Sequence, residues 1–318
     1  MRTKLIEFTT TDQLKLPGLL YTPETNNNSN KKAVINLHGN GSASVFYSVQ
    51  RAQDFARVFT KHGLSFFTFN NRGAHYIKTI NVDQTEEAVD GRRDDQDEIA
   101  LGTTYELIKD CVHDIEGAVN FLQTRGYEQF YLMGHSSGAN KICVYNHYRP
   151  ENEISRYILL GGGDDTGIWY QVIGDRDKYF KYLQQAKNKI EQGKGRKIIP
   201  KYILDYWFSY QSFYDVCNPD GDYNTFPFYE HLHPEDKLST QPLFRCFKAI
   251  TKPTLVIYGE HDQYAPKESG AKANQILKKQ AAGKGSFYFD LTSQADHSFH
   301  DREKQTALKI TSLLEQAV

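Results

Sequence analysis

One serine of this 318-residue chain stands in a pattern that could make it a nucleophile. Ser136 is the central residue of Gly134-His135-Ser136-Ser137-Gly138, which matches G-x-S-x-G. The pattern alone is weak, because a chain of this length contains one by chance about one time in ten. This copy, however, follows the apolar run 130–133 and precedes a helical segment that starts at Ala139. A serine on such a strand-to-helix turn is held in a strained backbone conformation, with its oxygen pointing out of the sheet.

A repeated unit of apolar strand and glycine turn predicts the elements that would position this serine. Continuous apolar runs bounded by glycine are typical of strands buried on both faces. Such runs occupy 33–37, 64–69, 130–133, 157–160 and 254–258, and a last strand is expected at 286–291. Two extended runs within 4–21 predict an antiparallel hairpin before them. Helices are expected at 45–61, 104–124, 139–148, 267–281 and 302–317. Strands that alternate with helices predict an α/β fold with a mostly parallel sheet covered on both faces.

Two regions are longer than this alternation requires. Residues 74–103 are rich in charged side chains between 86 and 98, so we expect an exposed excursion there. Residues 164–250 exceed the length of one crossover helix. They carry twelve aromatic side chains between residues 169 and 214. An inserted helical cap would explain both the length and the aromatic content. These aromatic side chains could line an apolar pocket above Ser136 or simply pack the cap onto the rest of the protein.

Four motifs together resemble the α/β-hydrolase superfamily, and its esterase-like members in particular. Besides Gly134–Gly138 they are His38-Gly39-Asn40-Gly41, Tyr258-Gly259-Glu260-His261-Asp262 and Ala295-Asp296-His297-Ser298-Phe299. The resemblance covers nearly the whole chain apart from the two long regions. It implies an α/β-hydrolase fold: a mostly parallel central sheet flanked by helices, with 1–163 and 251–318 as the core and 164–250 as the inserted cap.

The resemblance also implies a role for each motif. Ser136 would be the nucleophile, Asp262 the acid and His297 the base, in the chain order that this fold uses. A serine hydroxyl needs a base to accept its proton, which is a role suited to histidine. The carboxylate would orient the imidazole and stabilise its charged form. The backbone N–H groups of Asn40 and Ser137 would form the oxyanion hole. The reaction expected is hydrolysis of a carboxylic ester of a small molecule through an acyl-serine intermediate, with no cofactor and no metal.

Some of these roles have competing candidates nearby. His300 lies three residues after His297 and could be the base instead. Asp164 and Asp165 follow the strand that ends at Gly161, and some members of this fold place the acid there. Asp296 adjoins the proposed base, but we expect it to be a solvated loop residue.

Other functions remain open or receive little support. The same triad serves thioesterases, amidases and peptidases, and some proteins of this fold bind ligands without catalysis. Residues 39–44 imitate a dinucleotide-binding loop but lack its third glycine. His231 and His233 could bind a metal, yet no third histidine follows or precedes them at the sequence spacing typical of metal ligands. The short basic run 194–197 is better explained as a solvated surface than as a nucleic-acid site.

Composition indicates a soluble globular protein. The formal net charge is −1, so no general attraction to nucleic acid or acidic lipid is expected. The first eight residues lack the apolar core of a secretory signal, and no apolar stretch is long enough to span a membrane. The four cysteines, with no CxxC pair, are typical of reduced thiols. A cytoplasmic location is therefore expected, whereas the oligomeric state has no signal in the sequence.

Overall fold

A central sheet of eight strands organises the protein. The computed structural model describes residues 1–24, 31–47, 49–81 and 98–316. The strands are β1 (Arg2–Thr9), β2 (Lys15–Thr22), β3 (Lys32–Leu37), β4 (Ser65–Phe69), β7 (Gln129–His135), β8 (Ile154–Leu160), β9 (Thr254–Gly259) and β10 (Phe287–Thr292). Their order in the sheet is β1-β2-β4-β3-β7-β8-β9-β10. The strands from β4 to β10 run parallel, and the hairpin β1–β2 joins β4 in antiparallel fashion. The predicted α/β class and parallel sheet are confirmed.

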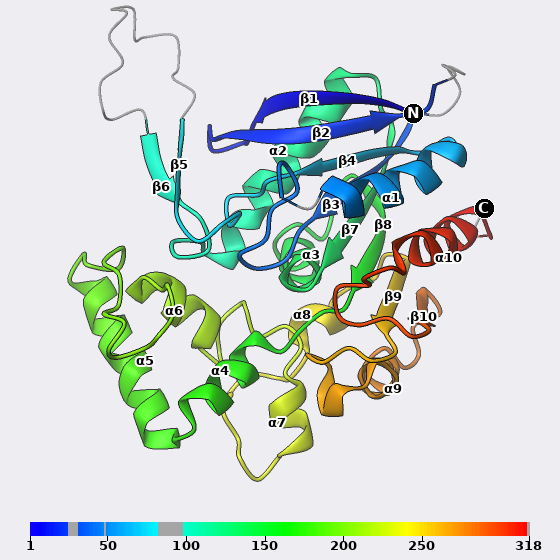
Figure 1. Cartoon of the computed structure of the whole chain (residues 1–318). Coiled ribbons are helices and arrows are strands. Elements are labelled where there is room, and N and C mark those ends of the chain that lie inside the picture. The colour runs from blue at the N-terminus through cyan, green and yellow to red at the C-terminus, as the bar shows by residue number, and fades with distance from the viewer. Residues whose placement is uncertain (25–30, 48, 82–97, 317–318) are drawn as a thin grey trace, which may run out of the picture.

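Helices cover both faces of this sheet (Figure 1). One face packs on α1 (Val49–Lys61) and α10 (Glu303–Gln316). The other packs on α2 (Cys111–Thr124), α3 (Ser137–Tyr148) and α9 (Gly270–Gln280). Side chains alternate along a strand, so in β7 Leu132 enters one core and Met133 the other. This double burial explains why the strands are continuous apolar runs rather than alternating ones.

Two predicted helices begin four or more residues later than expected. The helix predicted at 104–124 begins at Cys111, after a short 3-10 turn, Ile108–Asp110. A tight turn occupies the preceding residues, where the carbonyl oxygen of Gly102 accepts hydrogen bonds from the backbone N–H groups of Tyr105 and Glu106. Gly102 has a φ of +106°, which only glycine adopts readily. The helix predicted from residue 45 begins at Val49.

The segment predicted as an excursion contains a separate two-stranded ribbon. Its strands β5 (Lys78–Asn81) and β6 (Glu98–Leu101) pair in antiparallel fashion. Most of the charged run expected to be exposed, from residue 86 to residue 97, lies outside the described residues.

Helices fill the long connection from β8 to β9. They are α4 (Asp165–Ile173), α5 (Arg176–Glu191), α6 (Tyr210–Cys217), α7 (Phe228–Leu232) and α8 (Arg245–Lys248). Figure 1 shows them on the side of the molecule toward which β8 points. Many aromatic side chains of this region are buried, among them Tyr179, Phe208 and Phe226, and they join the core beneath α2 and α3. The division of the chain into a core and a cap at 164–250 stays a prediction.

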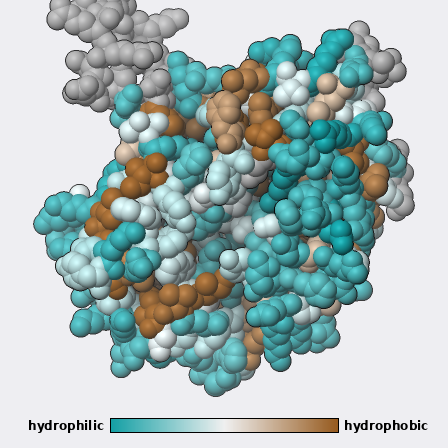
Figure 2. Space-filling model, in the orientation of Figure 1, coloured by the Kyte–Doolittle hydropathy of each residue, from teal (hydrophilic) through white to brown (hydrophobic). Residues whose placement is uncertain are grey.

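The face of the molecule shown in Figure 2 is mainly polar. In Figure 2 hydrophilic residues cover most of the visible face, and hydrophobic residues gather in a few separate groups. Among the described residues, no helix combines the length and apolar character that crossing a bilayer requires. All four cysteines are free and buried.

Candidate active site

Ser136 lies at the sharp turn from β7 into α3. Its backbone has φ 57° and ψ −126°, a conformation that is strained for a residue with a side chain. Its N–H donates to the carbonyl oxygen of Leu160 in the next strand, at 2.9 Å. The two flanking glycines are required by close approach. A Cβ on Gly134 would lie 2.3 Å from the carbonyl oxygen of Gly138, and one on Gly138 would lie 2.5 Å from that of Leu37. The spacing G-x-S-x-G is therefore the packing requirement of this turn.

Asp262 and His297 meet at the carboxyl ends of β9 and β10. The His297 Nδ1 donates to the Asp262 Oδ1 at 2.9 Å, and both side chains are buried. The backbone N–H of Tyr264 donates to the same carboxylate oxygen, also at 2.9 Å. Gly161 permits the pair to sit against the end of β8, since a Cβ there would lie 3.1 Å from Asp262 Oδ2. The bond through Nδ1 leaves Nε2 as the unprotonated nitrogen of a neutral ring.

One pocket contains both the serine and the histidine. Ser136, His297 and Asn40 line a pocket of about 830 Å³ at the carboxyl edge of the sheet. Helix α4 supplies part of its wall, through Asp165, Ile168 and Trp169. In parallel α/β sheets this edge is where ligands bind. Three of the residues that the sequence suggested for the site therefore lie around a space that could hold a substrate.

His135 supports the loop that carries His297. Its Nε2–H donates to the His297 carbonyl oxygen at 2.7 Å. Burial lowers the pKa of His135 well below its ordinary value, and the nearby Arg51 guanidinium lowers it further, so the ring is neutral. The sequence motif left this position open, and nothing in the pattern of the chain indicates the contact with His297.

The oxyanion hole is proposed to consist of two backbone donors, the N–H groups of Asn40 and Ser137. Within the described parts of the chain, no hydrogen bond engages the N–H of Asn40 or of Ser137. Ser137 opens α3, where the first N–H groups of a helix have no partner within it.

Thr103 fixes the loop that carries Asn40. Its Oγ1 accepts a hydrogen bond from the Gly41 N–H at 2.8 Å. The same hydroxyl lies 2.8 Å from Asn40 Oδ1 and 2.9 Å from the Gly73 carbonyl oxygen, so it can donate to either. Thr103 is only 5% exposed. It belongs to the segment that the sequence suggested was an exposed excursion, and sequence reasoning missed it.

His38 anchors the beginning of the same loop. Its Nε2 accepts from the Asn71 N–H at 3.1 Å, so Nδ1 carries the proton and donates to the Gly39 carbonyl oxygen at 2.9 Å. Burial lowers the pKa of His38 well below its ordinary value and keeps the ring neutral.

A buried ion cluster holds the chain just after Asn71. Arg72 contacts Asp114 at 2.8 Å and Asp12 at 2.9 Å, and its backbone N–H also donates to Asp114. Arg72 and Asp114 are almost fully buried. The cluster thus ties the end of β4, which supports the Asn40 loop, to helix α2 and to the hairpin.

Of the competing candidates, Asp165 and His300 line the same pocket as Ser136, whereas Asp164 and Asp296 accept hydrogen bonds from backbone N–H groups. Asp164 caps α4 by accepting from the Gly167 N–H at 2.8 Å, and it also accepts from the Tyr229 N–H. Burial raises the pKa of Asp164 to about 7. His300 is exposed at the pocket rim, where it lies 3.6 Å from Asp301. Asp296 accepts from the His300 N–H, as a loop carboxylate. The described residues contain no group of three His, Cys, Asp or Glu side chains arranged to hold a metal ion.

Solved esterase structures share this fold. Est1E from Butyrivibrio proteoclasticus with bound ferulic acid aligns with a TM-score of 0.60 at 14% identity, over 98% of each chain. A highly thermostable carboxyl esterase from Bacillus coagulans aligns with a TM-score of 0.60 at 13% identity, over 99% of each chain. A soluble variant of monoglyceride lipase from Saccharomyces cerevisiae gives 0.56 at 17% identity, over 99% of this chain and 96% of that one. At these identities the likeness shows the fold alone.

Comparison of sequences gives a family. No curated protein matches the chain. Residues 99–316, more than half of the chain, match the family described as protein of unknown function (DUF1749). The chain therefore belongs to the DUF1749 family, and its fold is that of the α/β-hydrolases.

Proposed function

We propose that this protein is a serine hydrolase that cleaves carboxylic esters through an acyl-serine intermediate. One observation carries the proposal. Ser136, with its strained backbone, shares a pocket with His297, and the Nδ1 of His297 is hydrogen-bonded to the buried Asp262. A serine held in this way next to an oriented neutral imidazole is the arrangement that activates a hydroxyl for attack. The esterase structures of the same fold support this choice of bond.

In the proposed reaction the Ser136 Oγ attacks the ester carbonyl carbon and the His297 Nε2 takes its proton. The Asp262 carboxylate holds the imidazolium through Nδ1–H. The N–H groups of Asn40 and Ser137 stabilise the oxyanion, each contributing about 3 kcal/mol. The C–O bond to the alcohol then breaks as His297 returns the proton to the leaving oxygen. Water, activated by His297, next attacks the acyl-serine and releases the acid.

Labelling with a fluorophosphonate tests the reactive serine directly. The wild-type protein and Ser136→Ala are treated with the probe, and the adduct is located by intact mass and peptide mapping. We expect one adduct at Ser136, none in the variant, and loss of ester hydrolysis with the fold intact by circular dichroism. Ser137→Ala is a useful comparison, because it removes a neighbouring hydroxyl and keeps the proposed backbone donor. Ester hydrolysis retained by Ser136→Ala would refute the proposal.

A further inference from the structure

The wall of the Ser136 pocket contains a carboxylate oxygen with no hydrogen-bond partner among the described residues. Asp165, the first residue of α4, lines the pocket. Its Oδ2 is shielded from water and has no hydrogen-bond partner among the residues that the structure describes. The neighbouring Asp164, by contrast, accepts from two backbone N–H groups. Burying a carboxylate oxygen without a hydrogen-bond donor costs folding free energy. An oxygen of this kind in the wall of a pocket therefore indicates that a bound ligand supplies the donor.

Aromatic rings line the pocket on the same side. Trp169, one helical turn after Asp165, and Tyr206 both line the pocket, and their ring centroids lie 4.9 Å apart in a T-shaped arrangement. Tyr76 extends the cluster, with its ring 5.8 Å from that of Tyr206. A carboxylate next to aromatic faces is the arrangement that proteins use to bind ammonium groups, since both attract a positive charge.

The remaining charges of the pocket lining also favour a cation. Within the described parts of the chain, four carboxylates line it, namely Asp165, Asp54, Asp301 and Glu303, together with one guanidinium, that of Arg51. Asp54 is compensated from outside the pocket by Arg57 at 2.9 Å and by Lys304 at 3.7 Å. The other three still outnumber Arg51, so the pocket favours positive charge over negative.

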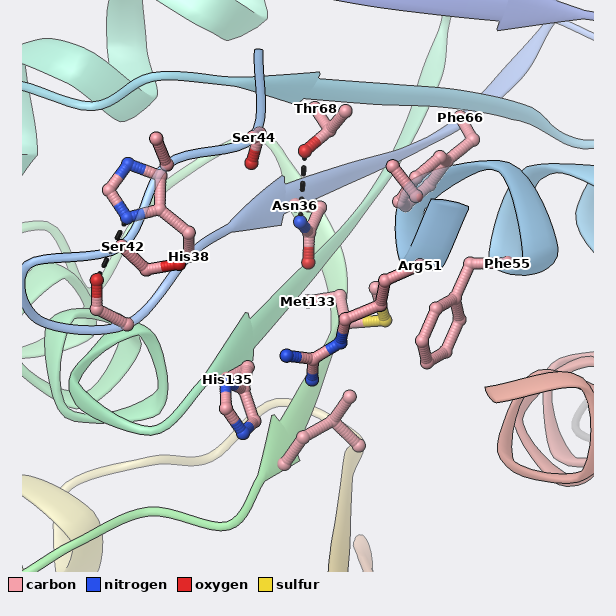
Figure 3. Close-up of a pocket in the computed structure, with 14 residues that line it drawn as sticks. Asn36, His38, Ser42, Ser44, Arg51, Phe55, Phe66, Thr68, Met133 and His135 are labelled. Carbon is pink, nitrogen blue, oxygen red and sulfur yellow. Dashed lines mark hydrogen bonds between the residues drawn. The ribbon is translucent and has the colours of Figure 1, made fainter. Parts of the chain in front are cut away.

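Arg51 also lines a second, smaller cavity. Figure 3 shows it extending from α1 toward His135, at a small cavity of about 40 Å³ beside the Asn40 loop. Arg51 and Asp165 have no mutual contact among the hydrogen bonds and ion pairs of the described residues. The Arg51 guanidinium therefore does not neutralise the Asp165 carboxylate through a direct ion pair.

We propose that the ester substrate carries a cationic nitrogen group, which Asp165 binds with Trp169 and Tyr206 beside it. This inference rests on the proposed function and adds a substrate class to it. Asp165 would determine specificity and take no part in the bond-breaking steps. The ammonium could belong to the acyl group or to the alcohol, and the experiment distinguishes these two.

Two pairs of esters that differ only in charge test the site. For the acyl side, p-nitrophenyl 6-aminohexanoate is compared with p-nitrophenyl heptanoate, in which a methyl group replaces the ammonium. For the alcohol side, acetylcholine is compared with 3,3-dimethylbutyl acetate, in which carbon replaces the quaternary nitrogen. We expect wild-type kcat/KM to favour the cationic member of at least one pair by about tenfold or more.

The variant Asp165→Asn keeps the shape of the side chain and removes its charge. We expect it to lose most of that preference, measured as the ratio of kcat/KM for the cationic ester to kcat/KM for the neutral ester of the same pair. Asp205→Asn is the matched control, because it removes a carboxylate that is 91% exposed and precedes Tyr206, without being part of the pocket lining. It should retain the wild-type preference.

The outcomes separate the two proposals. Hydrolysis of the neutral esters with no preference for either cation, or a preference that Asp165→Asn leaves unchanged, would overturn the cation site alone. Absence of fluorophosphonate labelling together with absence of hydrolysis of all four esters would overturn the proposed function, and the cation site with it.

Discussion

Replacing Thr103 by valine removes one hydroxyl from beneath the Asn40 loop and leaves the volume of the side chain almost unchanged. The Gly41 N–H and the Gly73 carbonyl oxygen each lose a partner, at 2.8 and 2.9 Å in the intact protein. Gly73 is buried, whereas Gly41 is half-buried and within reach of water. We therefore expect the free energy of unfolding to fall by about 1–3 kcal/mol. Complete loss of an oxyanion donor costs about 10²–10³ in kcat. Loosening the loop that carries the donor should cost less, about 10- to 100-fold.

The kinetic parameters distinguish a catalytic effect from a merely structural one. If Thr103 positions the Asn40 N–H, kcat should fall while KM for a neutral p-nitrophenyl ester changes by less than about threefold, because the interaction strengthens in the transition state. Thr103→Ser keeps the hydroxyl and should restore kcat to near the wild-type value. Stability is measured in parallel by urea unfolding. A folded valine variant with wild-type kcat would refute the idea that this hydroxyl positions the oxyanion loop.

Three further predictions follow from packing and burial. Gly138→Ala should lower the free energy of unfolding in urea by about 2–4 kcal/mol, because the new Cβ would lie 2.5 Å from a carbonyl oxygen. Gly285→Ala is the control: its Cβ would have no atom within 4 Å, and the free energy of unfolding should change by less than about 0.5 kcal/mol. Arg72→Met should cost about 3–5 kcal/mol in the same assay, since it leaves the buried Asp114 unpaired, and near-wild-type stability would contradict this. Burial raises the pKa of Asp165 from 3.8 to about 6, so the folded state binds the proton more tightly than the unfolded chain and stability falls as pH rises from about 4 to 7. Urea unfolding at pH 4.5 and 7.5 should show that Asp165→Asn removes about 2 kcal/mol of this decline, and an equal decline in both proteins would contradict the assignment.

The sheet and the surroundings of Ser136 could be predicted because they rest on local patterns. Buried parallel strands are apolar runs that end in glycine. The strands predicted from these runs agree with the observed ones to within one or two residues at each end, with one exception. The strand predicted at 157–160 begins three residues earlier, at Ile154. The glycines around Ser136 are dictated by contacts within the turn and by the adjacent strand. Such requirements leave a mark on the sequence at fixed spacing.

The supporting contacts could not be predicted, because they join distant segments without any spacing rule. Thr103 meets Gly41 across 62 residues, and His135 meets His297 across 162. A threonine in a charged segment looks like a surface residue until the tertiary fold buries it. The sequence offers Asp165 as an alternative to Asp262, and the structure places it in the pocket wall with Trp169.

The order of the motifs along the chain has a consequence for folding. Ser136 is in place once β7 and α3 have formed, but His297 follows β10, which pairs with the sheet only through β9. A refolding chain can therefore complete most of its sheet while the serine still lacks its base. The chain would then become compact before Ser136 becomes reactive. Under the proposed mechanism, tyrosine and tryptophan fluorescence should recover before Ser136 reacts with the fluorophosphonate. Pairing of β10 with β9 would be the step that produces the reactive serine.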